Sequence, residues 1–99
     1  MSQGPFQVVS LGSANKRVLN ISTDTLVKAT PGYVVTVSVV DGGSADGAVH
    51  DAATIATAAT ANKICVVSQT EGAYSINFPA SSGIVVKPGT GQVIAISYN

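Results

Sequence analysis

The chain has 99 residues, which is enough for one domain with a single modest core and leaves no room for a second domain. Only 10% of the residues are charged, five basic and five acidic, whereas an average soluble domain has about 25%. Because these charges balance and are scattered, they exclude the basic face that binds nucleic acid or an anionic membrane. So few charges favour a surface that is partly covered by partners.

At the start of the chain, Gly4-Pro5 and Gly12-Ser13 enclose one short apolar run, Phe6–Val9. No basic stretch followed by an apolar stretch is present there, as a secretory signal requires, and no apolar run approaches the ~20 residues of a membrane span. We therefore expect residues 1–16 to form an extended arm that packs on its own sheet or reaches another subunit. We also expect a soluble protein made in a cytoplasm.

Runs of apolar and β-branched residues, separated by turn residues, predict the strands that follow the arm. We expect them at Arg17–Ile21, Thr25–Ala29, Gly32–Asp41, Ala48–His50, Lys63–Ser68, Tyr74–Phe78, Gly83–Lys87 and Gln92–Tyr98. In the clearest strand, GYVVTVSVVD, strict alternation predicts one strongly buried face. It groups Tyr33, Val35, Val37 and Val39 on one face and Val34, Thr36, Ser38 and Val40 on the other.

Two later strands also alternate large and small residues. Tyr74, Ile76 and Phe78 are separated by Ser75 and Asn77, and Ile94, Ile96 and Tyr98 are separated by smaller residues. We expect each of these strands to bury one face and expose the other.

The segment Asp51–Ala61, DAATIATAATA, departs from the strand pattern because Ile55 is its only large apolar residue. Asp51 is suited to cap a short helix through its carboxylate, and alanine favours helix, whereas the threonines oppose it. We expect a loop with one or two helical turns near residues 52–60, lying across the domain or against a neighbour.

Together, eight or nine short strands without a long amphipathic helix predict an all-β fold. We expect residues 17–99 to form an antiparallel β-sandwich, and the pattern leaves jelly-roll and immunoglobulin-like topologies both open.

Candidate chemistry is sparse. Cys65 is the single cysteine and lies in an apolar run, so we interpret it as a small core residue, with neither a disulfide nor a multi-cysteine metal site. Adjacent residues on a strand point to opposite faces, so the pair His50-Asp51 is not expected to form a catalytic hydrogen bond. We predict no enzyme activity and no cofactor or metal. Tyr33 and Tyr98 are the aromatic residues to inspect for an exposed, partner-binding face, together with Phe6 in the arm.

Two glycine-rich stretches resemble ligand loops only superficially. DGGSADG, residues 41–47, lacks the later acidic ligands of a calcium loop, and we interpret it as a hairpin turn. PGTG, residues 88–91, lacks the lysine and the following helix of a phosphate loop. We interpret GIVVKPGTGQVIAISYN, residues 83–99, as a closing hairpin in which Gly89 and Gly91 supply positive φ. If its last strand lay at a sheet edge, a neighbour could dock there.

Three stretches carry a resemblance: ATPGYVVTVSVV (29–40), VHDAAT (49–54) with the Ala/Thr tract after it, and GIVVKPGTGQVIAISY (83–98). In this combination the chain resembles small all-β virion proteins of tailed bacteriophages, over roughly residues 17–98. The resemblance implies a noncatalytic structural role and brings no catalytic residues.

The expected function is therefore that of a capsid decoration or cement protein on the outer surface of the virion. Its partners would be the major capsid protein and further copies of itself, as a trimer or dimer, with arm exchange as the tie between copies. A tail, baseplate or head-fibre module that recognises a host surface is the alternative. A carbohydrate-binding module is the alternative from another class.

Overall fold

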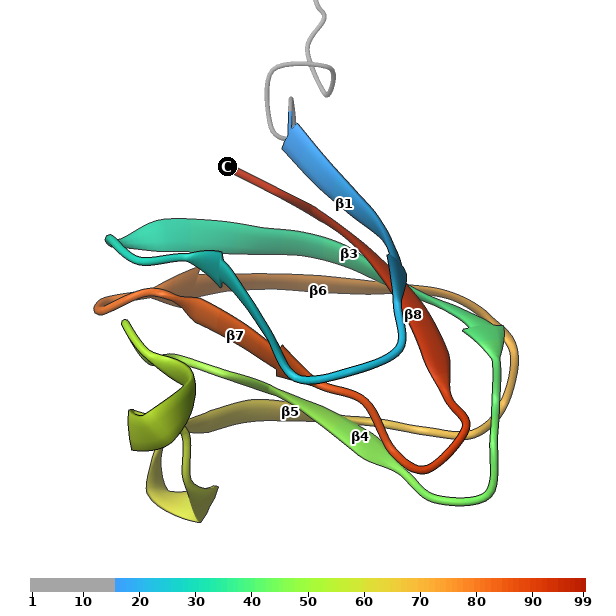
Figure 1. Ribbon diagram of the computed structural model, residues 1–99. Coiled ribbons are helices and arrows are strands. Elements are labelled where there is room, and N and C mark those ends of the chain that lie inside the picture. The colour runs from blue at the N-terminus through green and yellow to red at the C-terminus, as the bar shows by residue number, and fades with distance from the viewer. Residues whose placement is uncertain (1–15) are drawn as a thin grey trace, which may run out of the picture.

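The structure is a computed structural model that describes residues 16–99, and the expected strand at Phe6–Val9 lies outside these residues. It contains eight strands and two single 3-10 turns (Figure 1). The strands are β1 (Lys16–Ile21), β2 (Thr25–Lys28), β3 (Gly32–Asp41), β4 (Gly47–His50), β5 (Lys63–Val67), β6 (Gly72–Ala80), β7 (Ile84–Lys87) and β8 (Val93–Tyr98), and the turns are η2 (Ile55–Thr57) and η3 (Thr60–Asn62). Lys16, assigned to the arm from the sequence, is the first residue of β1 and pairs with Tyr98.

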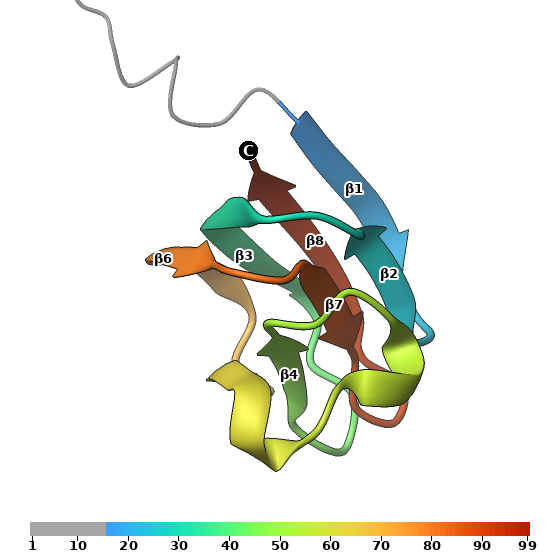
Figure 2. The same ribbon diagram turned by 90° about the vertical axis from the view of Figure 1, so that its left-hand side faces the viewer.

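The strands form two four-stranded sheets, with the orders β1-β8-β3-β6 and β2-β7-β4-β5. Every paired neighbour is antiparallel, and the pairs β1/β8, β2/β7, β3/β6 and β4/β5 are nested within one another along the chain. The sheets pack face to face, so the predicted antiparallel sandwich is confirmed (Figure 2). Eight strands in this nested order form a jelly roll, which decides between the two topologies left open by the sequence.

Two loops predicted as hairpin turns instead connect the two sheets. β7 pairs with β2 and β4, whereas β8 pairs with β1 and β3, so residues 88–92 cross from one sheet to the other. The loop after Asp41 likewise joins β3 in one sheet to β4 in the other. β8 lies inside its sheet, between β1 and β3, so it offers no free edge to a neighbour.

The loop between β7 and β8 is held by a buried side chain. Gln92 is 0% exposed, its Oε1 accepts a hydrogen bond from the Gly89 N–H, and its Nε2 donates to the carbonyl oxygens of Val67 and Ser68. Of the two loop glycines, Gly91 has the predicted positive φ, 72°, but Gly89 does not. Gly89 is required for another reason, because a Cβ there would lie 2.0 Å from the Ala45 carbonyl oxygen.

The core lies between the two sheets and consists almost entirely of aliphatic side chains. Its buried members are Ile21, Val34, Val37, Val39, Val49, Val67, Ala80, Ile84, Val86, Ile94 and Ile96. Ile94 and Ile96 are buried and Tyr98 packs against the cluster, so the inward face predicted for β8 is confirmed.

β3 does not follow the strict alternation that its sequence suggests. Val34, Val37 and Val39 are buried, whereas Tyr33 and Val40 are exposed. The register with β6 and with β8 shifts between Val34 and Thr36, so a bulge moves the buried face by one residue at this point. Sequence periodicity missed the bulge because valine suits either face of a strand.

The Asp51 side chain connects the end of β4 to the loop between β6 and β7. Its carboxylate accepts hydrogen bonds from the backbone N–H groups of Ser81, Ser82 and Gly83, at 3.0, 2.7 and 3.3 Å. The prediction that Asp51 caps a helix is therefore wrong, because its carboxylate is used between the β4 end and the β6–β7 loop. The two single turns, η2 and η3, follow it and lie at the β4–β5 end of the second sheet (Figure 1).

This carboxylate makes stability depend on pH. Burial raises the pKa of Asp51, but the hydrogen bonds from Ser82, Ser81 and Gly83 outweigh burial and hold the pKa below its ordinary value. The ionised form thus stabilises the fold, fully above the unfolded pKa of about 3.9, and this contribution is lost as pH falls through the lower folded pKa. We expect Asp51→Asn to lower the free energy of unfolding by about 1 kcal/mol near pH 7 and by less below pH ~4.

Urea titrations at several pH values measure this difference. Asp24→Asn is the control, because it removes one charge from an exposed turn residue that makes no comparable set of backbone bonds. If the free energy of unfolding of Asp51→Asn stayed below that of the unmodified chain by the same amount down to the lowest pH, the role of the ionised carboxylate would be contradicted.

Candidate functional site

The sandwich is open along one side, where an edge strand of each sheet faces the other. β5 ends one sheet and β6 ends the other, and a groove of about 290 Å³ lies between them. We call this region the seam and define it by the groove-lining residues and one exposed aromatic beside them. They are Val37, Cys65, Val66, Val67, Ser68, Tyr74, Ser75, Ile76 and Phe78. None of these side chains is charged.

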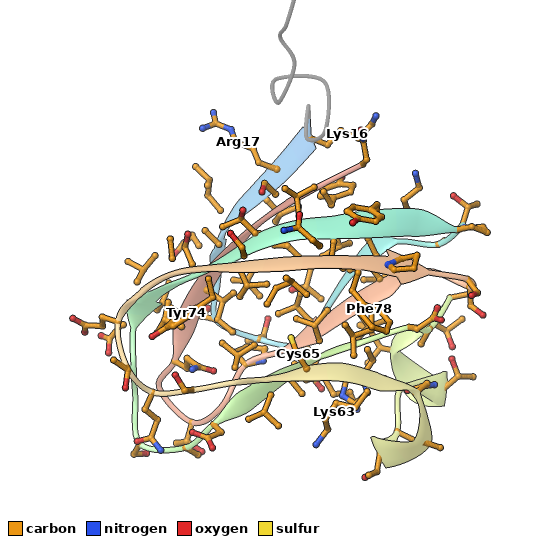
Figure 3. All side chains as sticks on the ribbon, turned by 180° about the vertical axis from the view of Figure 1, so that it is seen from behind. Lys16, Arg17, Lys63, Cys65, Tyr74 and Phe78 are labelled. Atoms are coloured by element: carbon orange, nitrogen blue, oxygen red, sulfur yellow. The ribbon has the colours of Figure 1, made fainter. Side chains whose placement is uncertain are left out.

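The large side chains of β6 point toward the core without being covered by it. Tyr74 pairs with buried Val37, and Phe78 pairs with buried Val34, so both lie on the inner face of the sheet. They nevertheless remain 37% and 50% exposed, because no further strand among residues 16–99 lies beyond β6. Figure 3 shows both rings directed from β6 toward β5. Tyr74 and Phe78 therefore point toward the core as the sequence predicts, but they are exposed where the sequence predicts that they are buried.

A second irregularity shapes β6 within this face. Asn77 has a φ of 50°, in the left-handed region where asparagine is better tolerated than most residues, and it coincides with the register shift between β3 and β6. Ile76 and Phe78, on either side of Asn77, both lie on the inner face, where Ile76 packs against the core and Phe78 pairs with buried Val34. At the other end of the groove, the Tyr74 hydroxyl donates to the Thr70 carbonyl oxygen at 2.6 Å and fixes the ring.

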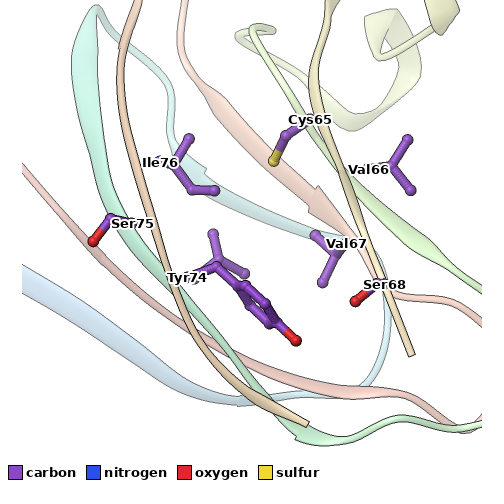
Figure 4. A pocket seen from close by; sticks show the side chains of 8 residues that line it. Cys65, Val66, Val67, Ser68, Tyr74, Ser75 and Ile76 are labelled. Atoms are coloured by element: carbon purple, nitrogen blue, oxygen red, sulfur yellow. The ribbon is translucent and has the colours of Figure 1, made fainter. Parts of the chain in front are cut away.

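Cys65 contributes the β5 side of the seam. It pairs with buried Val49, so its thiol points inward, and Figure 4 shows it directed into the groove with Val67 while Val66 points away. The residue packs against the core, as expected from the sequence, but is only partly buried. Desolvation by burial raises the pKa of the Cys65 thiol, and a backbone hydrogen bond with Val49 lowers it by a smaller amount.

We expect this environment to slow alkylation of Cys65 in the folded protein. Because the pKa is raised, the reactive thiolate forms at higher pH in the folded chain than in the unfolded one. Labelling with iodoacetamide at pH 8 should be several-fold slower in buffer than in urea, and its pH profile should shift upward. The control is Ser68→Cys in a Cys65→Ser background, which places the thiol at an exposed neighbouring position. Its labelling rates in buffer and in urea should be nearly the same. Equal rates for folded and unfolded Cys65 would contradict the assignment.

Of the three aromatic residues predicted for partner contact, the two that the structure describes, Tyr33 and Tyr98, lie on opposite faces of their sheet. Phe6 lies outside the described residues. Tyr33 is 36% exposed on the outer face of its sheet. Tyr98 pairs with buried Val34 and packs against the core, so it lies on the inner face. Tyr33 and Tyr98 therefore cannot form one stacking platform.

A polar groove lies on the outer side of the second sheet. Its charged lining comes from Asp24, Asp46, Lys63 and Lys87, with buried His50 at its base. The His50 Nδ1 lies 2.9 Å from the Ala59 carbonyl oxygen and 3.1 Å from the Asn62 Oδ1. Both partners are acceptors, so Nδ1 carries the proton and donates to them.

His50 and Asp51 are thus used by different parts of the structure. His50 holds the turn that contains η3, whereas Asp51 binds the backbone of residues 81–83. Within residues 16–99, no group of three or more His, Cys, Asp and Glu side chains is arranged to bind a metal ion. In the same part of the chain, the helical segments are all too short to span a lipid bilayer.

Comparison with protein-family models, curated proteins and solved structures finds no match to this chain.

Local sequence patterns do not reveal the seam. Its exposed members, Val66, Tyr74 and Phe78, occur in ordinary strand patterns, and their exposure follows from the positions of β5 and β6 at the ends of two different sheets. The only signal in the sequence is its low fraction of charged residues, 10% against about 25% in an average soluble domain.

Proposed function

We propose that the chain is a noncatalytic structural protein of a bacteriophage particle, which binds the outer capsid lattice as a decoration or cement protein. The observation that carries the proposal is the uncharged, partly exposed seam on a jelly roll with few surface charges. Contiguous exposed apolar surface of this kind is typical of sites for protein–protein interaction. The jelly roll is also used by viral capsid domains, although it hosts other functions as well.

A cement protein acts by differential binding. It binds the assembled lattice more tightly than free capsid subunits, so each bound copy adds its binding free energy to the stability of the shell. Many copies with modest interfaces together strengthen the particle without any catalytic group. In this proposal the major capsid protein is the partner, and copies of the chain associate as trimers or dimers around local symmetry axes.

Purified particles test the proposal. Quantitative mass spectrometry should find this chain in amounts comparable to the major capsid protein, and particles that lack it should lose their DNA at lower temperature. Absence of the chain from particles would refute the structural role. A few to tens of copies, confined to one end of the particle, would instead assign the chain to the tail, baseplate or head fibre.

A carbohydrate-binding module remains the second candidate, because lectins share the jelly roll and the polar groove beside His50 offers hydrogen-bonding groups. The opposed orientations of Tyr33 and Tyr98 argue against a shared aromatic platform for sugars. Glycan-array binding that vanished with Lys87→Ala, or with Tyr33→Ala, would favour this function over the structural one, whereas Tyr98→Ala would disturb the core.

A further inference from the structure

We propose that the seam between β5 and β6 of one copy binds the N-terminal segment Phe6–Leu11 of another copy. The inference goes beyond the proposed function, since it assigns a specific contact between copies of this chain whatever assembly they belong to. The segment would lie along the open edge with Phe6 in the groove, as an added strand fills an exposed sheet edge.

The first argument is the chemistry of the seam. The groove between Cys65 and Tyr74 measures about 290 Å³, near the lower end of ligand-pocket volumes, so it suits one or two large apolar side chains. Tyr74 lines the groove and is 37% exposed, Phe78 beside it is 50% exposed, and no charged side chain lines the groove. The edge strand β6 also has hydrogen-bonding groups on its outer side that no strand among residues 16–99 uses.

The second argument is the chemistry of the segment. Residues 1–15 contain no charged side chain, and FQVVSL is their one apolar run. Alternation puts Phe6 and Val8 on the same side of an extended chain, matching the inward-facing row that an added strand needs. Gly4-Pro5 and Gly12-Ser13 bound this run, which makes it a discrete strand-length unit.

The third argument is the length of chain between the segment and β1, which favours binding to another copy over binding to the same copy. Lys16 begins β1, which lies at the opposite end of the sheet from β6, three strand spacings or about 14 Å away. The five residue steps from Leu11 to Lys16 span at most about 17 Å when fully extended. Phe6–Leu11 could therefore bind the seam of its own copy only if residues 11–16 were fully extended straight across the sheet. A neighbouring copy can present its seam without this restraint.

Cys65 makes the contact directly testable, because it is the single cysteine of the chain and its thiol points into the groove. The variant Phe6→Cys/Cys65→Ser carries a thiol only in the segment, and the unmodified chain carries one only in the seam. The two proteins are mixed and oxidised with copper phenanthroline at alkaline pH, where the thiolate of Cys65 forms. Thermal unfolding of each protein beforehand checks that both are folded.

We expect a disulfide-linked dimer of the two different chains, formed at least about tenfold faster than with the control Ser2→Cys/Cys65→Ser, because docking raises the effective concentration of the thiols. A rate equal to that of the control would overturn the proposal. So would fast dimers of the unmodified chain through Cys65, which would place two seams face to face. An internal disulfide in Phe6→Cys with native Cys65, formed in dilute monomer, would show docking on the chain's own seam and would equally overturn it. A negative result here leaves the virion experiment intact, so the two proposals fail separately.

Discussion

Replacing Gln92 with leucine should lower the free energy of unfolding by about 2–4 kcal/mol, because it leaves buried backbone groups without partners. The side chain is fully buried and bonds the Gly89 N–H and the carbonyl oxygens of Val67 and Ser68. Leucine has a similar size but offers neither donor nor acceptor. Against a total stability of about 5–15 kcal/mol for a domain of this kind, such a loss is severe.

The matched control is Gln69→Leu. Gln69 is exposed, and its Nε2 donates to the Asp46 carboxylate at 3.3 Å on the surface, so its loss should change stability by at most about 0.5 kcal/mol. Urea unfolding followed by circular dichroism measures both. Similar losses for the two glutamines would contradict the structural role assigned to Gln92.

Val34→Asp should abolish folding, whereas Val40→Asp should be tolerated. Val34 is 0% exposed within the core, and Val40 is 60% exposed. Burying an unpaired carboxylate costs more than about 4 kcal/mol, which exceeds what most small domains can lose, whereas an exposed substitution typically changes stability by about 0.5 kcal/mol. Soluble expression and circular dichroism distinguish the two outcomes.

The pair also tests the β3 bulge, because unbroken alternation would put Val34 and Val40 on the same face. Equal tolerance of aspartate at both positions would mean that the bulge is absent. The milder Val34→Ala keeps the comparison quantitative if the aspartate variant does not accumulate. It should cost about 2 kcal/mol, against a few tenths for Val40→Ala.

The strands were predictable because their signals are local. The segment Gly32–Asp41 has the bounds given by its turn residues, and all eight strands predicted after the arm are present, with ends that differ by a few residues at most. Alternating β-branched residues bounded by glycine and proline specify an extended segment regardless of its neighbours. The all-β sandwich follows from the number and spacing of such segments.

The pairing of the strands could not be predicted in the same way. Pro88, Gly89 and Gly91 predict a change of chain direction, and they suit a tight hairpin and a loop between sheets equally well. Which of the two forms depends on contacts distant in sequence, such as the bonds from Gln92 to Val67 and Ser68. The seam was hidden for the same reason, because Tyr74 is a core residue or a surface residue according to what lies beyond its strand.

The nested order of the strands has a consequence for folding kinetics. β1 pairs only with β8 in its sheet, and β2 pairs only with β7, so the outermost pairs join the two ends of the described chain. Contacts of such long sequence separation slow folding, because the entropy of closing large loops is lost before the contacts form. The pair β4/β5 is the most local one and is the natural place for pairing to begin. A chain in which β8 has not yet been synthesised would hold β1 and β3 without β8 between them, so this domain folds only after β8 has left the ribosome, and its incomplete forms are prone to aggregation.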